Sequence, residues 1–253
     1  MDNKVRGGPM LDVPFAKEQR TFDGLGLREG EEPLYAFAWH PRLVLLPTWR
    51  LDTRARVTKR LVDIVVSLTA LALFAVPALL IMLAIRLESP GPVLFRQQRI
   101  GLLGRGFTTL KFRTMFAHHE DTGAIEQATR DDPRVTRAGR WLRRYSIDEV
   151  PQLINVLRGD MSMVGPRPHA PGTRAGGHLF EEVTECYGAR HFVKPGLTGL
   201  AQVRGWRGET DTEEKLLHRI DCDFEYIAHW SIGLDLAIMW RTALSVLRMR
   251  NVY

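Results

Sequence analysis

One long apolar segment dominates the hydrophobic pattern of the chain. From Ile64 to Ile85 there is no charged residue, and apolar side chains occupy every face of a helix instead of one stripe. About 20 such residues are enough for a helix to cross a bilayer. The alternative is a buried core helix of a soluble protein. The pattern favours a single membrane helix at about 61–87 that is followed by a large polar domain.

Basic residues flank this segment on both sides, with Arg54 and Arg60 before it and Arg86 and Arg96 after it. A simple spanning helix would place one of these groups outside, although basic residues favour the cytoplasmic side of a membrane. Pro77 lies inside the apolar run, and proline kinks a helix because it lacks a backbone donor. The sequence therefore predicts a re-entrant helix that breaks at Pro77 and leaves the membrane on the side where it entered.

The pattern after this segment predicts amphipathic helices and a few short strands. Strands are expected at 93–95 and 107–112 around a glycine-containing turn, and a polar loop at 116–130. Helices are expected at 134–143, from about Asp148 to Gly159, at 212–229 and at 234–247. The first of these carries arginine at every third position, which is typical of a basic binding face or of a solvated one. The expected fold class is α+β and mainly helical.

Length and charge add an anionic partner to this picture. The 253 residues allow one domain with a leader. We place the leader at 1–56 and the domain at 57–253. Within the leader, the apolar run between Pro41 and Pro47 is expected as either a strand or a surface-docking segment. A net charge of +6 and an isoelectric point near 9.6 indicate nucleic acid, phosphorylated molecules or an acidic membrane. Cys186 and Cys222 fit no metal-ligand spacing and are expected to be buried thiols.

The candidate chemistry lies in the stretch RRYSIDEVPQL, which begins at Arg143. Ser146 and Glu149 match the spacing of a helix capping box. That assignment places Pro151 inside the helix, whereas a helix that starts at about Asp148 has its proline in the first turn, where it is tolerated. Asp148 would then be ionised, because the helix dipole and the arginines upstream both favour the charged carboxylate. These residues alone leave two interpretations open, a helix cap and a carboxylate nucleophile.

Several longer motifs resemble one known family in the expected order over about three quarters of the chain. They are KRLVD, SPGPVLFRQQRIG, LKFRTM, DPRVTRAGRWLRRYSIDEVPQLINVLRGDMSMVGPRP, VKPGLTGLAQV and WSIGLDLAI. With these motifs the chain resembles the monotopic phosphoglycosyl transferases, a family of bacterial sugar transferases. The stretch GWRGETDT is similar to the subgroup that transfers glucose 1-phosphate to undecaprenyl phosphate for exopolysaccharide synthesis.

The resemblance implies an activity and a location. The enzyme would take a UDP-sugar and undecaprenyl phosphate with Mg2+, release UMP, and form a covalent phosphosugar-aspartyl intermediate. It would lie in the bacterial inner membrane among its lipids, held by a re-entrant helix, with the catalytic domain on the cytoplasmic face. Glucose is the expected sugar and galactose the alternative, and a homodimer is left open.

The resemblance also implies roles for individual residues. Asp148 would be the nucleophile and Glu149 its partner, and both would bind the metal. Since phosphoryl transfer depends on charge neutralisation, cations from separate segments are the candidate phosphate ligands. They are Arg143, Lys111, Arg113, Arg207 and Arg167, the last within the element Pro166, Arg167 and Pro168.

Two other functions are weighed against the transferase. A membrane-anchored nucleic-acid-binding protein would explain the positive charge, but no nucleic-acid-binding motif or series of stacking aromatics is present, so no nucleic acid is expected. A scaffold that has lost activity would explain the fold, but the acidic dyad is intact.

Overall fold

The computed structural model describes residues 35–39, 42–46, 53–116 and 132–247. Most of the predicted leader lies outside these ranges. Within the leader, β1 (Tyr35–Trp39) and β2 (Arg42–Leu46) pair antiparallel, so the apolar run before Pro47 is a strand. The loop expected at 116–130 lies outside the described residues except for Phe116. The rest is mainly helical with short strands, as the sequence predicts.

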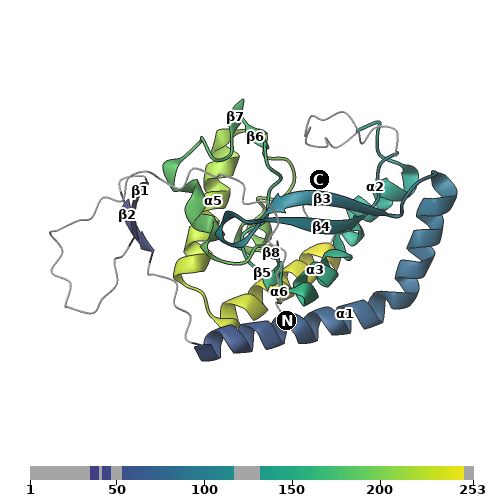
Figure 1. Ribbon diagram of the computed structural model, residues 1–253, viewed down its shortest axis with the longest axis horizontal. Coiled ribbons are helices and arrows are strands. Elements are labelled where there is room, and N and C mark those ends of the chain that lie inside the picture. Colours follow the sequence, from purple (N-terminus) through teal and green to yellow (C-terminus); the bar gives the residue numbers. More distant parts are fainter. Residues whose placement is uncertain (1–34, 40–41, 47–52, 117–131, 248–253) are drawn as a thin grey trace, which may run out of the picture.

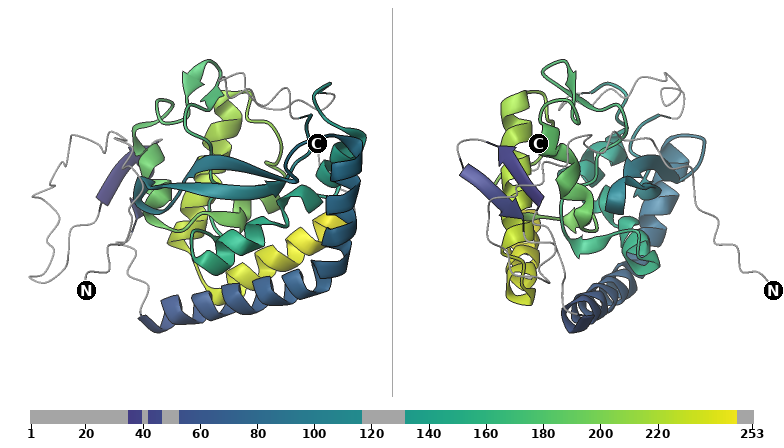
Figure 2. Two further views of the ribbon diagram at one scale, coloured as in Figure 1. Left: turned by 45° about the vertical axis from the view of Figure 1, so that its right-hand side comes forward. Right: turned by 60° about the vertical axis from the view of Figure 1, so that its left-hand side comes forward.

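Helix α1 (Thr53–Glu88) is longer than expected and includes the basic residues that precede the apolar run. Figures 1 and 2 show it as two legs joined by a bend in its C-terminal part, and Pro77 is the proline inside this helix. Only 6 % of its most apolar window is buried, which contradicts the alternative of a buried core helix. The exposed side chains include Leu73, Leu80 and Leu87. One helix of the described part is thus long and apolar enough to cross a membrane.

The N-terminal leg of α1 is fastened to the polar domain by charged side chains. Lys59 forms an ion pair of 2.6 Å with Asp235 and donates to the Val164 carbonyl at 3.1 Å. Arg60 donates to the carbonyls of Val156 and Leu157, both at 2.6 Å. These contacts join the leg to α3 (Gln152–Arg158), to β5 (Ser162–Val164) and to α6 (Ile232–Leu247).

Asp63 lies one turn further along the same leg and also contacts β5. Its Oδ1 accepts hydrogen bonds from Ser162 Oγ at 3.0 Å and from the Met163 amide at 2.9 Å. The KRLVD motif therefore fixes α1 on the domain.

The C-terminal end of α1 contacts the same domain through Glu88. Its carboxylate accepts hydrogen bonds from the amides of Arg137 and Ala138, at 2.6 Å and 2.9 Å, at the start of α2 (Arg137–Arg144). A carboxylate stabilises this position because the amides at a helix N-terminus have no partner within the helix. A small cluster of Ile85, Phe112 and Leu142 packs beneath this contact.

The predicted hairpin is present and its first strand is longer than expected. Strands β3 (Leu94–Ile100) and β4 (Gly106–Phe112) pair antiparallel over their whole length, joined by a short 3-10 turn, η1 (Leu102–Gly104). Figure 1 shows this hairpin across the middle of the domain, on the far side of α3 from the long leg of α1. Helix α2 packs on the chain just after β4 so closely that a Cβ on Gly139 would lie 2.1 Å from the Thr114 carbonyl oxygen.

The main core lies under the remaining elements. Helix α5 (Glu213–Ala228) begins where predicted, with Thr212 capping the Lys215 amide, and α6 begins two residues earlier than expected. Buried residues of α5, such as Ile220 and Phe224, pack with Leu200 of α4 (Leu200–Val203) and Tyr187 of η4 (Glu185–Phe192). Both cysteines are buried free thiols, as expected.

A parallel strand pair that the sequence pattern did not indicate lies beside this core. Strand β5 pairs with β8 (Gly196–Thr198). A Cβ on Gly196 would lie 2.1 Å from the Gly165 amide nitrogen, so the two strands lie side by side only because glycine is present. A two-residue pair, β6 (Arg174–Ala175) with β7 (His178–Leu179), completes the strands.

The ion pair between Lys59 and Asp235 leads to the first prediction. Lys59→Met should lower the free energy of unfolding by about 3–5 kcal/mol, because the buried carboxylate of Asp235 would lose its cation. The double variant with Asp235→Leu should be less destabilised than the single one, since no unpaired charge remains. Thermal and denaturant unfolding in detergent would measure both. Arg56→Met, at an exposed position of the same helix, is the control and should leave unfolding unchanged. Equal unfolding of Lys59→Met and the parent protein would contradict the anchoring role.

Candidate active site

Asp148 and Glu149 lie on a short 3-10 turn, η3 (Ile147–Glu149), between α2 and α3. Ser146 has a left-handed backbone (φ 55°) and its side chain makes no capping bond, so the capping-box interpretation is wrong. The expectation that the α-helix begins at about Asp148 is also wrong, since α3 begins at Gln152. Pro151 explains the difference, because it has no N–H with which to bond the carbonyl of Ile147. Gly159 ends α3 with φ 92°, as predicted.

Glu149 is held by two cations from distant segments. Lys111 of β4 donates to Oε1 at 2.8 Å, and Arg167 donates to Oε2 at 3.2 Å and also to Oε1. Burial alone would raise the pKa of Glu149, but Arg167 and Lys111 outweigh it and hold the pKa well below its usual range. Glu149 is therefore a fixed carboxylate that keeps both cations at the site.

Asp148 is buried, at 8 % exposure, and it has no hydrogen-bond partner in the described part of the chain. The pKa of Asp148 is raised to about 6, chiefly by burial and also by the neighbouring Glu149, against the opposing charges of Lys111, Arg143 and Arg167. The expectation that its surroundings favour the ionised form is therefore corrected. At pH 7 the carboxylate is still largely ionised, poorly solvated and without a partner, which suits a nucleophile.

Arg143 and Arg144 take different positions at the end of α2. Arg143 donates from Nε to Thr114 Oγ1 at 2.9 Å, and its charge acts on Asp148. Arg144 is exposed. Of the two arginines upstream of the dyad, Arg143 is thus the one that the fold turns toward it.

Arg167 projects from a tightly held loop after β5. Each carbonyl of Pro166, Arg167 and Pro168 accepts a hydrogen bond, from the Gly196 amide at 2.9 Å, Arg190 at 2.9 Å and Arg99 at 3.0 Å. Arg190 is itself fixed by Asp223 at 2.6 Å and by the hydroxyl of Tyr187 at 2.6 Å. This preorganisation fixes where the guanidinium of Arg167 can reach.

The other two predicted phosphate ligands differ in position. Arg113 is buried and donates to the Ser89 carbonyl at 2.6 Å and the Pro90 carbonyl at 2.8 Å, which ties β4 to the end of α1. This placement favours a structural role over the predicted phosphate contact. Arg207 lies close enough to Arg167 and Glu149 for their charges to act on it. The structure therefore brings Arg207 to the site.

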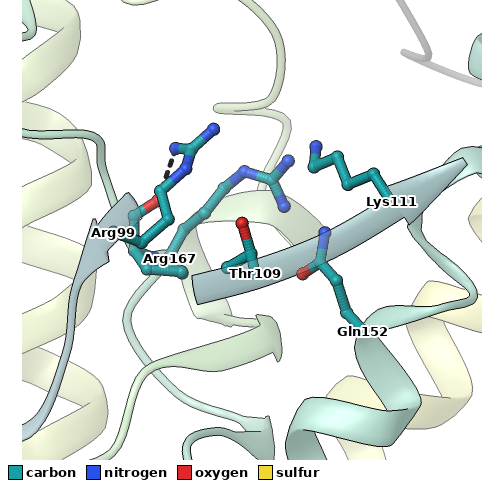
Figure 3. Close-up of a pocket in the computed structure, with 6 residues that line it drawn as sticks. Arg99, Thr109, Lys111, Gln152 and Arg167 are labelled. Carbon is teal, nitrogen blue, oxygen red and sulfur yellow. Dashed lines mark hydrogen bonds between the residues drawn. The ribbon is translucent and has the colours of Figure 1, made fainter. Parts of the chain in front are cut away.

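Sequence reasoning missed part of the site wall. A small pocket beside Lys111, Arg167 and Pro168 is also lined by Arg99, Thr109 and Gln152, and Figure 3 shows Gln152 reaching β4 from the start of α3 while Thr109, Lys111 and Arg167 lie over the strand. Strand alternation could have found Thr109, because it lies two residues from the predicted Lys111 and so shares a face of β4. Arg99 is brought there by the pairing of β3 with β4.

The donors for a metal are few. Within the described residues, no cluster of three or more His, Cys, Asp or Glu side chains is present. Mg2+ commonly takes one or two protein carboxylates and completes its shell with water and substrate phosphates. Asp148 together with a bound phosphate fits that donor set, whereas both oxygens of Glu149 are already engaged by cations.

Comparison with known proteins places this chain in a family. Residues 54–249 match the family model described as bacterial sugar transferase. The chain belongs to the bacterial sugar transferase family. It is 53 % identical over 208 residues, 82 % of its length, to a UDP-glucose:undecaprenyl-phosphate glucose-1-phosphate transferase of Caulobacter vibrioides, of which it covers 75 %.

Two further members of the sugar transferase family differ in length. An undecaprenyl-phosphate glucose phosphotransferase of Komagataeibacter xylinus is 52 % identical over 195 residues, 77 % of this chain, yet the chain spans only 37 % of that relative. An exopolysaccharide production protein of Rhizobium leguminosarum is 48 % identical over 191 residues, 76 % of this chain and 96 % of the relative.

The different surroundings of Arg167 and Arg113 make the second prediction. Arg167→Met should lower kcat/KM about ten- to a hundredfold with little change in melting temperature, since it removes a charge-assisted contact. Arg113→Met should lower the melting temperature, because two buried carbonyls lose their donor, and should keep most of the activity at low temperature. Thermal unfolding and initial rates on the same preparations would separate the two. An inactive Arg113→Met protein with normal melting would contradict the structural role.

Proposed function

We propose that the protein transfers a hexose 1-phosphate from a UDP-sugar to undecaprenyl phosphate and releases UMP, as the first membrane step of exopolysaccharide or other glycan synthesis. The observation that carries the proposal is the unpartnered, buried carboxylate of Asp148 beside Lys111, Arg143 and Arg167. Such a carboxylate is suited to attack phosphorus, and the cations would neutralise the anionic substrate.

In the first step, an oxygen of Asp148 attacks the phosphorus that carries the sugar. An O–P bond to Asp148 forms while the O–P bond to the uridine monophosphate breaks, and UMP leaves with the electron pair. Lys111, Arg143 and Arg167 stabilise the charge on the transferred phosphate. Glu149 acts through the cations, because its two oxygens hold Lys111 and Arg167 in position.

In the second step, an oxygen of undecaprenyl phosphate attacks the same phosphorus. The bond to Asp148 breaks and its carboxylate is restored, which leaves a polyprenyl diphosphate sugar. The proposal includes Mg2+, held by Asp148 and substrate phosphates. When bound, the ion would supply further neutralisation of phosphate charge.

We also propose that α1 is re-entrant and that the domain lies on the cytoplasmic face of the bacterial inner membrane. Its 36 residues would span about 54 Å if straight, more than the ~30 Å hydrocarbon core. Yet its first leg is fastened to the domain through Lys59 and Asp63, and its last residue through Glu88. A polar domain that contacts both ends of a membrane helix supports entry and exit on one side, and the basic flanks favour the cytoplasm.

The proposed sugar is glucose, with galactose as the alternative. Two of the relatives carry glucose in their names, and GWRGETDT resembles the glucose subgroup. A screen of UDP-sugars with undecaprenyl phosphate in nanodiscs, read by UMP release, should show the highest kcat/KM for UDP-glucose. The same screen tests the non-catalytic scaffold, which would release no UMP. Binding of a DNA duplex at physiological salt would instead support the nucleic-acid-binding alternative.

The covalent step makes the third prediction. Incubation with UDP-glucose labelled in the sugar, without lipid acceptor, should leave label on the peptide that contains Asp148. Asp148→Asn should abolish both labelling and turnover, since an amide is a poor nucleophile. Addition of undecaprenyl phosphate should then remove the label from the parent protein.

The control for this experiment is Asp160→Asn, which alters a carboxylate beyond the end of α3 and should label normally. Mass spectrometry of the labelled peptide and UMP release are the measurements. Normal turnover by Asp148→Asn would overturn the covalent mechanism.

The re-entrant helix makes the fourth prediction. Single cysteines at Thr53 and Arg96, both exposed, should resist a membrane-impermeant thiol reagent in intact spheroplasts and react after lysis, in a background without Cys186 and Cys222. Pro77→Leu should favour a straight, spanning form, so that Thr53→Cys becomes reactive in spheroplasts and activity falls. Reaction of either position in spheroplasts of the parent background would contradict the re-entrant topology.

A further inference from the structure

Three arginines near Arg167 have a buried guanidinium nitrogen without a partner. They are Arg99, Arg207 and Arg219, and in each the Nε atom is buried and makes no hydrogen bond within the described part of the chain. Buried polar groups are nearly always hydrogen-bonded, because burial without a partner costs free energy. Three such donors in one region therefore indicate a site that is completed by a ligand.

The three arginines come from separate elements. Arg99 lies near the end of β3 and donates to the Pro168 carbonyl at 3.0 Å and to Gln97 at 2.5 Å. Arg219 lies on α5 and donates to the Gly208 carbonyl at 2.8 Å and to Thr210, so it holds the loop that carries Arg207. Arg207 itself makes no hydrogen bond to any described residue.

Arg167 is their common neighbour. Burial and the charge of Arg167 together lower the pKa of Arg99 to about 10. The same two causes, with the charge of Arg190, lower the pKa of Arg219 to about 10, and burial and Arg167 also lower the pKa of Arg207. Glu149 acts in the opposite sense on Arg99 and Arg207, but it is already shared by Lys111 and Arg167.

Arg219 also lacks a carboxylate of its own. Asp223 acts on it, but Asp223 is bonded to Arg190 at 2.6 Å. The fold thus gathers positive charge that no described side chain neutralises in full. A bound anion would relieve this repulsion and would accept the unused hydrogen bonds.

The position of this cluster relative to Asp148 indicates which phosphate it would take. The charge of Arg167 acts on Asp148 and also on Arg99, Arg207 and Arg219. Arg167 therefore connects the nucleophile to the three arginines. A diphosphate has two adjacent phosphates, so one can meet Asp148 while the other meets the arginines.

We propose that Arg99, Arg207 and Arg219, beside Arg167, form a second anion pocket that binds the uridine-side phosphate of the nucleotide diphosphate. This inference rests on the proposed function. The pocket would place the uridine monophosphate as the leaving group opposite Asp148, and it would stabilise the charge that develops there when the O–P bond breaks. The phosphate of the lipid acceptor is the competing occupant, and the experiment separates the two.

The test compares binding of UMP and uridine to the full chain in detergent. Uridine lacks the phosphate, so its affinity reports on the rest of the nucleotide site and on folding. Arg207→Met and Arg219→Met should each weaken UMP binding about ten- to a hundredfold and leave uridine binding unchanged. Arg207→Met is the sharper variant, because no intramolecular hydrogen bond is lost. Arg105→Met, at the exposed turn of the hairpin, is the control and should bind UMP normally.

The two half-reactions supply the second readout. Labelling of the protein by UDP-glucose should slow in Arg207→Met, whereas release of the label to undecaprenyl phosphate should keep its rate. Unchanged UMP affinity, or slowing of the release step alone, would overturn the inference, and the second result would assign the pocket to the lipid phosphate. Failure of the proposed function is distinguishable, because the parent protein would then form no labelled intermediate, whatever its affinity for UMP.

Discussion

The site depends on the ion pairs that Glu149 makes with Lys111 and Arg167. These three side chains come from a turn, a strand and a loop that are far apart in sequence, and Arg167 is the most exposed of them. Because Glu149 bonds to two cations, it keeps Lys111 if Arg167 is lost, so the pairs position the cations more than they stabilise the fold. The pairs therefore fix the hairpin, the dyad and the Pro-Arg-Pro loop relative to each other. They also leave the adjacent carboxylate of Asp148 without a cation of its own.

The two adjacent carboxylates thus differ for a physical reason. The pKa of Glu149 falls well below the usual range because two cations donate to it. Asp148 is buried and makes no hydrogen bond, and its pKa rises to about 6. Environments that push the pKa values of neighbouring groups apart are typical of catalytic pairs. In the proposed reaction Glu149 holds the cations in position and Asp148 forms the bond to phosphorus.

The long apolar helix α1 and the site are held together by direct contacts. Lys59 and Asp63 bond the first leg of α1 to α6 and to β5, which leads directly into the Pro-Arg-Pro loop, and Glu88 caps α2, which ends at Arg144. Leu142 of α2 and Phe112 of β4 pack against Ile85 in the second leg of α1. In the proposed re-entrant topology, the bend of α1 would determine how the site lies relative to the membrane.

Much of this could be predicted from local sequence, including the apolar helix, the hairpin, Gly159 as the end of α3, and the basic residues near an acidic dyad. Such features depend on periodicity and on the backbone preferences of glycine and proline, which act over a few residues. The start of α3 was predicted wrongly, because Pro151 separates the 3-10 turn that holds the dyad from the α-helix.

What only the tertiary structure decided is which charges meet. Arg113 and Arg167 look alike in sequence, yet one is bonded to the backbone of Ser89 and Pro90 and the other to Glu149. The same holds for Arg99 and Arg219, which join Arg167 through strand pairing and helix packing. Electrostatic energies depend on distance and burial, and neither is encoded in the spacing of residues along a chain.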